Sequence, residues 1–366
     1  MSLFRQPVLT DKKMHDDMKA LTIIVPSYNM EKYLAKCCES VVLESELMEC
    51  LEVIVVNDGS TDKTSEIGHS FERRYPGTFR VIDKPNGHYG SCVNRGLAEA
   101  KGEFVKLLDA DDTFDNKVFA DYMRFLVGGV DDRSLAEVDL VLTDHCDVDC
   151  RGTVTGRAVF KGKANVLLGP KDFVETKMEL FPSMSTFRTQ MLRDIGYRQT
   201  EGALYTDLEW GTYPMRGIRK IWYRPGAVYR YLHGREGQSI SAAVVGRNLV
   251  SMEKVLARMV AELSNFEGDA SVAEFFQRKL RSVAETLYYS YFIFAPIGAV
   301  NDGFARTEEI VKVNIILYDA AGGFVFSRRF RYPYVSRWRK SGHLSLPGIF
   351  LARVYSRLAN GIFRRN

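Results

Sequence analysis

The chain has 366 residues, of which 46% are hydrophobic and 26% are charged, a composition that is ordinary for a globular protein and excludes a disordered or fibrous one. This length exceeds what a single core usually supports, so we expect one large domain with an appendage. No run of about 18 apolar residues occurs, which argues against a spanning helix. The polar start of the chain does not resemble an export signal, so we expect a cytoplasmic protein.

The net charge of +4 is unevenly distributed. Residues 320–366 contain ten Lys or Arg and no Asp or Glu, so this stretch carries +10 and the rest of the chain about −6 by difference. A basic end on an acidic body predicts an anionic partner for the tail alone. No nucleic-acid recognition motif accompanies it, and we expect no nucleic-acid partner.

Short apolar runs alternate with amphipathic segments from residue 21 to about 148. This alternation predicts an α/β fold, with a Rossmann-like, mainly parallel sheet and helices on both of its faces. The expected strands are 21–26, 51–56, 79–82, 103–108 and 138–143, and the expected helices are 31–43, 91–100 and 115–127.

The rhythm changes beyond residue 150. Residues 181–231 are mixed and rich in aromatic side chains, and residues 247–300 have the apolar spacing of helices. We therefore expect a helical C-terminal region. The predicted organisation is an N-terminal extension (1–20), the α/β domain (21–241), a helical region (242–312) and a basic tail (313–366).

Three expected strands end in polar clusters, namely Ser27-Tyr28-Asn29, Asn57-Asp58-Gly59-Ser60 and Asp109-Ala110-Asp111-Asp112. Ligands bind at the carboxyl ends of strands in parallel sheets, so together these clusters predict one lip that holds a polar ligand. Gly59 permits a sharp turn, after which Ser60 or Thr61 can cap the next helix. Taken singly, an aspartate such as Asp58 builds a turn more often than it binds a ligand, and an aromatic such as Tyr28 packs more often than it stacks on a base.

The acidic cluster at 109–112 places three carboxylates in one turn. Such groups repel each other unless a cation shares them, and Mg²⁺ or Mn²⁺ prefers oxygen ligands. The alternative is a solvated turn that caps the helix expected from residue 115.

Three blocks, TIIVPSYNMEKYLAKCCESV, VIVVNDGSTDKT and GEFVKLLDADD, resemble family 2 glycosyltransferases of the GT-A fold in order and spacing, and PNGHYGSCVNRGLAEAKG resembles the stretch between them. The resemblance is close over 21–115 and looser over 181–241. It implies an inverting glycosyltransferase that moves a sugar from a nucleotide-sugar, most commonly a UDP-sugar. The acceptor would be a hydroxyl of a glycan or lipid-linked glycan in cell-surface or exopolysaccharide synthesis, and the cofactor Mn²⁺ or Mg²⁺.

The resemblance also implies roles for residues of the three strand ends. Pro26 and Tyr28 would frame the base and ribose, Asp58 would read the base and Lys84 would lie near the donor. In the acidic turn, Asp109 would contact ribose and metal, Ala110 would line the donor site and Asp111 would bridge metal and diphosphate. One departure is that Val93, rather than Arg, precedes Asn94, and Arg95 follows it, which leaves a donor contact from this arginine open.

The catalytic base is expected in LYTDLEW, which resembles the family's acidic block. Asp207 occupies the position of the carboxylate that deprotonates the acceptor hydroxyl, and Glu209 is the fallback. The alternative for Asp207 is a helix N-cap. In VYRYLHGREGQSIS, His233 and Arg235 would approach the diphosphate or metal.

The QxxRW signature of processive synthases is absent, which favours one sugar added per acceptor. Rival interpretations are a nucleotide-sugar-binding protein without activity, a nucleotidyltransferase and a polyprenyl-phosphate sugar transferase. A nucleotidyltransferase typically has a Gly-rich, basic loop after its first strand, which PSYNMEKY is not.

The tail carries an apolar stripe, formed by Leu351, Tyr355, Leu358 and Ile362. A basic amphipathic helix of this kind predicts docking on the anionic inner face of a membrane that carries a lipid-linked acceptor. The alternative is that the stripe packs on the helical region at 247–300.

Overall fold

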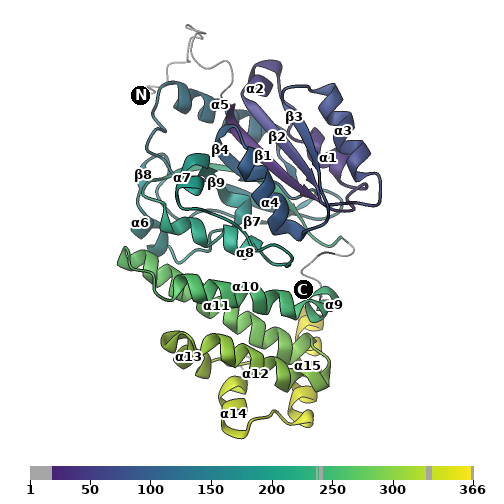
Figure 1. Ribbon diagram of the computed structural model, residues 1–366, viewed down its shortest axis with the longest axis vertical. Helices are drawn as coiled ribbons and strands as arrows, with labels where there is room; N and C mark the ends of the chain where they lie inside the picture. Colours follow the sequence, from purple (N-terminus) through teal and green to yellow (C-terminus); the bar gives the residue numbers. More distant parts are fainter. Residues whose placement is uncertain (1–18, 236–237, 239–241, 327–331, 364–366) are drawn as a thin grey trace. The chain divides into compact units, whose positions relative to one another are not determined.

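The computed structural model describes residues 19–235, 238, 242–326 and 332–363, with side chains up to Ser356 except at 242 and 243. The chain divides into two compact units (Figure 1). The first unit comprises Met1–Gly202 and Tyr213–Gly234, and the second comprises Ala203–Thr212 and Arg235–Asn366. The short segment 203–212 therefore belongs with the second unit although it interrupts the first in sequence.

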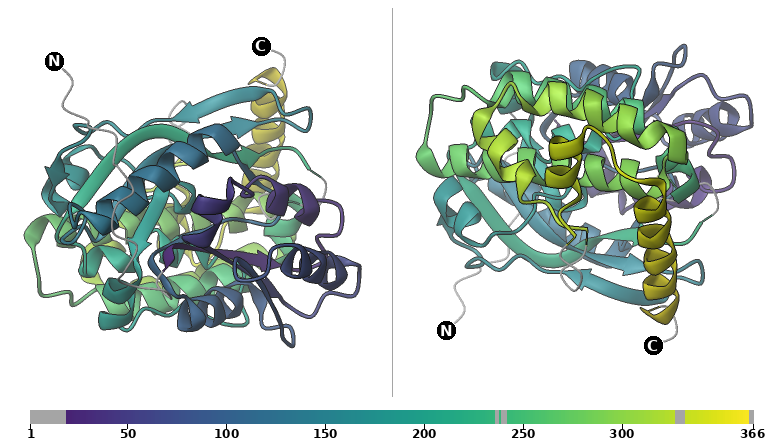
Figure 2. Two further views of the ribbon diagram at one scale, coloured as in Figure 1. Left: turned by 90° about the horizontal axis from the view of Figure 1, so that it is seen from above. Right: turned by 90° about the horizontal axis from the view of Figure 1, so that it is seen from below.

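The first unit is built on a curled sheet (Figure 2). The strand order is β3-β2-β1-β4-β9-β6-β10-β5, with β7 paired to β6 and β8 to β10. The strands are β1 (Lys19–Ser27), β2 (Leu51–Asn57), β3 (Phe79–Asp83), β4 (Gly102–Leu107), β5 (Thr113–Phe114), β6 (Leu140–Val148), β7 (Val154–Ala158), β8 (Leu167–Leu168), β9 (Ser185–Arg188) and β10 (Ile221–Leu232). The α/β fold and all five expected strands are confirmed.

Strands β3, β2, β1 and β4 are parallel, and β6 and β10 form a second parallel pair. Between them lies β9, which runs antiparallel to both β4 and β6. Strands β1 and β2 are buried along nearly their whole length, as expected for strands covered on both faces. The sheet is therefore a parallel half joined to a mixed half through one reversed strand.

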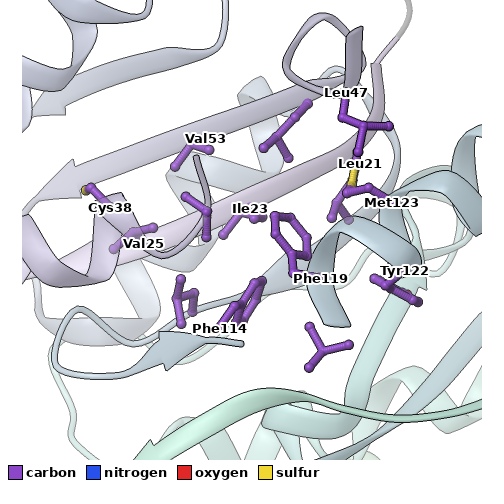
Figure 3. Packing of buried hydrophobic residues seen from close by; sticks show 14 of the residues in the cluster. Leu21, Ile23, Val25, Cys38, Leu47, Val53, Phe114, Phe119, Tyr122 and Met123 are labelled. Atoms are coloured by element: carbon purple, nitrogen blue, oxygen red, sulfur yellow. The ribbon is translucent and has the colours of Figure 1, made fainter. Parts of the chain in front are cut away.

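Helices cover both faces of the parallel half. Leu21, Ile23 and Val25 of β1 pack in the core beneath α1 and α5 (Figure 3), whereas Ile24 faces Gly96 of α4 on the other side. The helices of this unit are α1 (Leu34–Glu39), α2 (Ser45–Glu49), α3 (Thr64–Arg74), α4 (His88–Glu99), α5 (Asn116–Asp131), α6 (Pro170–Glu175) and α7 (Thr189–Asp194), with 3-10 turns η1 (Pro182–Met184) and η2 (Tyr213–Arg216).

Helix α1 is much shorter than the expected helix at 31–43. The hydroxyl of Ser40 donates to the Cys37 carbonyl and accepts from the backbone N–H of Phe114, so it ties the helix end to the strand that follows the acidic turn. The sequence periodicity continues past Ser40, but this tertiary contact ends the helix there.

The second unit is helical, as expected for the C-terminal region. Its helices are α8 (Asp207–Trp210), α9 (Ala242–Arg247), α10 (Leu249–Leu263), α11 (Ala270–Phe294), α12 (Val300–Val311), α13 (Ile315–Gly322), α14 (Tyr334–Ser341) and α15 (Leu346–Phe363), with one 3-10 turn, η3 (Ile297–Ala299). Among the described helices, none is both long and apolar enough to span a membrane.

Helix α15 packs on its own unit through one side only. Ile349 is fully buried, and the Arg353 guanidinium donates to the carbonyls of Phe292 and Ala295 at 2.9 and 2.7 Å, at the C-terminal end of α11. Leu351 is 67% exposed, whereas Tyr355 packs against Phe326. The two described members of the predicted stripe thus have different environments, and the side chains of Leu358 and Ile362 lie outside the described residues.

Candidate functional site

The carboxyl ends of β1, β2, β3 and β4 lie at one edge of the sheet because these strands are parallel neighbours. Pro26 is buried in β1 opposite Val56 of β2. Tyr28, directly after β1, is 47% exposed, which is unusual for a large aromatic side chain. An exposed ring at this edge can stack on a flat ligand.

The loops after β1 and β2 are joined by hydrogen bonds. Asn29 has a left-handed backbone conformation (φ 53°), its N–H donates to Ser60 Oγ at 2.9 Å, and its Oδ1 accepts from the N–H of Thr61 at 2.9 Å. Ser60 and Thr61 therefore do not cap the next helix as predicted. Asp62 bonds the Thr64 N–H at the start of α3 instead. A non-glycine residue with positive φ is costly and needs support, which these contacts give.

Asp58 and Lys84 form a largely buried ion pair. Asp58 is 3% exposed, and its Oδ1 accepts from Lys84 Nζ and from the Gly87 N–H at 2.9 Å. Lys84 Nζ also donates to Ser91 Oγ at 2.7 Å. The structure thus brings together two residues that the sequence assigned separately to the donor. The pair fixes the segment that leads into α4 and places opposite charges at the edge.

The acidic turn after β4 is held from several directions. Asp109 Oδ1 accepts from the Tyr89 hydroxyl at 2.8 Å. Asp112 is 1% exposed, and its two oxygens accept from the Tyr229 hydroxyl at 2.7 Å and the Leu232 N–H at 2.6 Å. Asp112 is therefore engaged inside the protein, while Asp109 and Asp111 are only partly buried. Ala110 is buried and contributes backbone to the turn.

Electrostatics at this turn favours a cation. Burial raises the pKa of Asp112 well above its usual value, and the neighbouring charges of Asp109 and Asp111 raise it further. No group of three His, Cys, Asp or Glu among the described residues is arranged to hold a metal ion by itself. Mg²⁺ and Mn²⁺ are commonly bound by one or two carboxylates together with substrate phosphates, and Asp109 and Asp111 fit that kind of site.

The end of β10 lies beside the acidic turn because Leu232 bonds Asp112. The next residue, His233, donates its N–H to the Val148 carbonyl, and its Nε2 lies 2.9 Å from Asp147 Oδ1. The His233 side chain is 42% exposed. Arg235 belongs to the second unit and is partly exposed there.

The two candidate bases, which both lie in the second unit, have different environments. Glu209 is fully buried and its Oε2 lies 3.1 Å from Nη1 of Arg258, so this carboxylate holds α8 to α10. Asp207 is exposed and is the first residue of α8, whose N-cap is Thr206. The predicted alternative of an N-cap at Asp207 is therefore wrong. Desolvation raises the pKa of Asp207, whereas hydrogen bonds from the backbone N–H groups of Asp207 and Leu208 and, last, the charge of Lys279 lower it.

The side chains of Asn94 and Arg95 have partners within the protein. Asn94 Nδ2 donates to the Gln199 carbonyl at 3.0 Å, and Arg95 pairs with Glu99 one turn further along α4. The site residues that sequence reasoning missed are Tyr89, Tyr229 and Asp147. Tyr89 stood within a recognised block, but nothing in the spacing signals Tyr229, which meets the acidic turn from more than a hundred residues away.

Comparison with known proteins matches the same part of the chain. A family model described as glycosyl transferase family 2 matches residues 22–132. An uncharacterized glycosyltransferase of Mycoplasma pneumoniae is 39% identical over 95 residues, which is 25% of this chain and 31% of the relative. The poly(ribitol-phosphate) β-N-acetylglucosaminyltransferase TarS of Staphylococcus aureus is 27% identical over 271 residues, 71% of this chain and 44% of the relative.

The chain thus spans less than half the length of either of these curated relatives. The crystal structure of residues 1–349 of TarS in complex with UDP-GlcNAc superposes with a TM-score of 0.55 at 19% identity, covering 89% of this chain and 93% of that one. This likeness confirms the expected GT-A architecture.

Proposed function

We propose that the protein is an inverting glycosyltransferase that moves a sugar from a nucleotide-sugar to an acceptor hydroxyl, on the premise that residues 22–132 match the model of glycosyl transferase family 2. The observation that carries the proposal is the meeting of three polar strand ends at one edge of the sheet, with an exposed aromatic ring, a buried ion pair and a fixed acidic turn side by side. That combination suits a ligand with a flat base, a polar sugar and a charged diphosphate.

The nucleotide would bind at the ends of β1 and β2. Tyr28 would stack on the base, with Pro26 beneath it, and Asp58 would read the base edge while Lys84 neutralises its charge. UDP is the proposed nucleotide. The TarS complex with UDP-GlcNAc supports it, because that protein shares this fold.

Asp109 and Asp111 would hold Mn²⁺ or Mg²⁺ together with the diphosphate. A bound divalent cation supplies charge stabilisation to the departing diphosphate. The neighbouring His233 and, from the second unit, Arg235 are the further groups that we assign to the anionic oxygens. The crowding of three carboxylates in one turn, which adds to the effect of burial in raising the pKa of Asp112, supports a cation there.

Asp207 is the proposed base. It would accept the proton of the acceptor hydroxyl as that oxygen attacks the anomeric carbon, and the bond from this carbon to the diphosphate breaks on the opposite face. Asp207 is exposed as a residue on α8 although its carboxyl group is desolvated, whereas the buried Glu209 is held in an ion pair with Arg258 and is unsuited to the role.

The acceptor class that we propose is a cell-surface or exopolysaccharide glycan, free or lipid-linked. The curated name of TarS, a poly(ribitol-phosphate) β-N-acetylglucosaminyltransferase, supports a cell-wall polymer as a first acceptor to test.

We also propose that α15 rests on an anionic membrane surface. Leu346, Phe350 and Leu351 are 61%, 60% and 67% exposed on the side that does not pack on α11, and the segment around them is basic without any acidic residue. Exposed apolar side chains within a basic segment suit the interface of an anionic leaflet.

Donor turnover is the direct test of the central proposal. UDP-GlcNAc and other UDP-sugars are incubated with the full chain in Mn²⁺, in Mg²⁺ and in EDTA, with and without a glycan acceptor, and released UDP is measured. We expect metal-dependent release that rises with acceptor. Binding without release indicates an inactive nucleotide-sugar-binding protein, and turnover only with a polyprenyl phosphate indicates the rival transferase. If the protein neither binds any nucleotide-sugar nor releases UDP from it, the assignment is wrong.

A further inference from the structure

A row of polar side chains runs beneath the acidic edge of the first unit. Ser183 Oγ lies 2.9 Å from His145 Nδ1, His145 Nε2 lies 3.8 Å from Asp147 Oδ1, and the same oxygen lies 2.9 Å from His233 Nε2. The residues come from η1, from β6 and from the end of β10. Only His233, at the end of the row, is substantially exposed.

The backbone at this end of the row is fixed in register. β10 runs parallel to β6 with Tyr231 opposite Asp147, and the N–H of His233 donates to the Val148 carbonyl at 2.9 Å. On its other side the adjacent Leu232 bonds Asp112 of the acidic turn. The position of His233 along the strand is thus set both by β6 and by the acids.

The Asp147 carboxylate occupies a space that only glycine leaves open. Gly156 of β7 lies opposite Asp147, and a Cβ at this glycine would come within 2.5 Å of Asp147 Oδ2. The backbone conformation of Gly156 does not itself require glycine, because its φ is not in the left-handed region. The absence of a side chain at Gly156 leaves room for the Asp147 carboxylate.

We propose that Asp147 is a positioning residue for His233. By accepting the Nε2–H, the carboxylate holds the imidazole in one orientation and one tautomer, so that the lone pair is on Nδ1. No described residue lies within hydrogen-bonding distance of Nδ1, which is therefore the ring nitrogen that can meet a metal ion or accept a proton from a ligand. His145, whose Nδ1 is bonded to Ser183, lies 3.8 Å from the same Asp147 oxygen.

This inference rests on the proposed function, in which His233 faces the diphosphate and its cation. An asparagine at 147 keeps the size of the side chain but can donate its amide N–H to Nε2, which favours the other tautomer. Asp147→Asn should therefore present an N–H from Nδ1 where a lone pair is needed. Gly156→Ala should displace the carboxylate without changing its chemistry.

Two measurements test the proposal. In the first, the dissociation constant of UDP is determined by calorimetry with Mn²⁺ and in EDTA. We expect Asp147→Asn to weaken binding in Mn²⁺ about 10- to 100-fold, with Gly156→Ala in the same direction and no change in EDTA. Asp121→Asn, the same chemical change at a 70% exposed carboxylate on α5, is the matched control.

The second measurement uses ¹⁵N-histidine NMR of the full chain without donor or metal, with the His233 signals assigned by their loss in His233→Gln. We expect the Nε2–H tautomer in the unsubstituted protein and a shift towards Nδ1–H in Asp147→Asn. An unchanged tautomer together with unchanged UDP affinity in Mn²⁺ overturns the positioning role. If the unsubstituted protein binds no UDP, the proposed function fails, and the tautomer shift still decides the role of Asp147.

Discussion

At the level of single residues, the three carboxylates of the acidic turn have different surroundings although they are nearly adjacent in sequence. Asp112 is buried and engaged by Tyr229 and Leu232, whereas Asp111 is partly exposed. The carboxylates differ because the side chain of Asp112 is the one that bonds β10. This difference gives Asp112 a structural role and agrees with the metal-binding role that we propose for Asp109 and Asp111.

The first prediction concerns Asp111→Asn. Removing this charge should weaken UDP binding in Mn²⁺ by at least about tenfold, or 1.4 kcal/mol, and leave the melting temperature unchanged because the residue is not part of the core. Calorimetry in Mn²⁺ and EDTA measures the first effect and thermal unfolding the second. If the unsubstituted protein binds UDP equally well in Mn²⁺ and in EDTA, the proposed metal site is wrong.

A second prediction separates the two acids of α8. Asp207→Asn should keep donor affinity and lower kcat by about 10²- to 10⁴-fold, because the carboxylate acts only in the transition state. Glu209→Gln should instead lower stability, since it removes the charge of a fully buried carboxylate that lies 3.1 Å from the Arg258 guanidinium. The assignment is wrong if Asp207→Asn transfers normally and Glu209→Gln folds but is inactive.

The third prediction follows from the raised pKa of Asp207. A base must be ionised to work, so activity should fall as the pH drops through this pKa, at a higher pH than for an ordinary aspartate. Lys279 lowers the Asp207 pKa, and Tyr205 is the other titratable group that interacts with it. Lys279→Met should therefore shift the acid limb of kcat/KM to higher pH. An acid limb that does not move argues against Asp207 as the titrating base.

For single residues, the sequence predicted where the polar side chains lie but not which of them contact one another. Asp58, Lys84 and the acids at 109–112 all lie where the strand ends placed them, because local apolar runs determine where a parallel strand stops. The pairing of Asp58 with Lys84 and the engagement of Asp112 by β10 were not predictable. They depend on contacts between residues 26 and about 120 positions apart, for which a single sequence carries no pattern.

At the level of elements, helix α4 is the one whose packing most directly affects the site. It begins at His88, next to the loop held by Asp58, and Gly96 lets it approach β1, because a Cβ there would lie 2.6 Å from a methyl group of Ile24. The expected helix began three residues later, since His88 adopts a positive φ that helical periodicity does not reveal.

The fourth prediction compares two glycine substitutions. Gly96→Ala should destabilise the protein by about 1–3 kcal/mol through overpacking against β1. Gly128→Ala in α5, where a Cβ meets nothing within 4 Å, should stabilise it by about 0.4–1 kcal/mol. The melting temperatures should therefore move in opposite directions. A rise for both would show that α4 adjusts freely, and the close approach would then lose its importance.

At the level of the whole molecule, the prediction from charge is only partly supported by packing. Of the basic side chains in the tail, Arg339 bonds Glu308 and the Tyr318 carbonyl, and Arg353 bonds the end of α11. Composition alone counts these as available for a partner. Within the described residues, Arg337 and Lys340 remain exposed.

The fifth prediction tests the membrane proposal without removing α15, whose buried Ile349 and Arg353 belong to its unit. Phe350→Glu with Leu351→Glu should reduce co-sedimentation with anionic liposomes at low salt, and leave the melting temperature unchanged. Val250→Glu, on a residue as exposed as Leu351 but in α10, is the matched control. Full-length protein that ignores anionic vesicles, or a double variant that binds as well as the control, would overturn the proposal.

The bonds from Tyr229 and Leu232 to Asp112 also bear on how the protein folds. The acidic turn is made early in the chain, but the groups that hold it arrive about 120 residues later, and β4 gains its second neighbour only when β9 has been synthesised. Such distant contacts form slowly because a long loop must close first. Within residues 22–132 the turn has local contacts such as the bond from Tyr89 to Asp109, but not those from β10. We therefore expect the acidic turn to reach its final form only after β10 has left the ribosome.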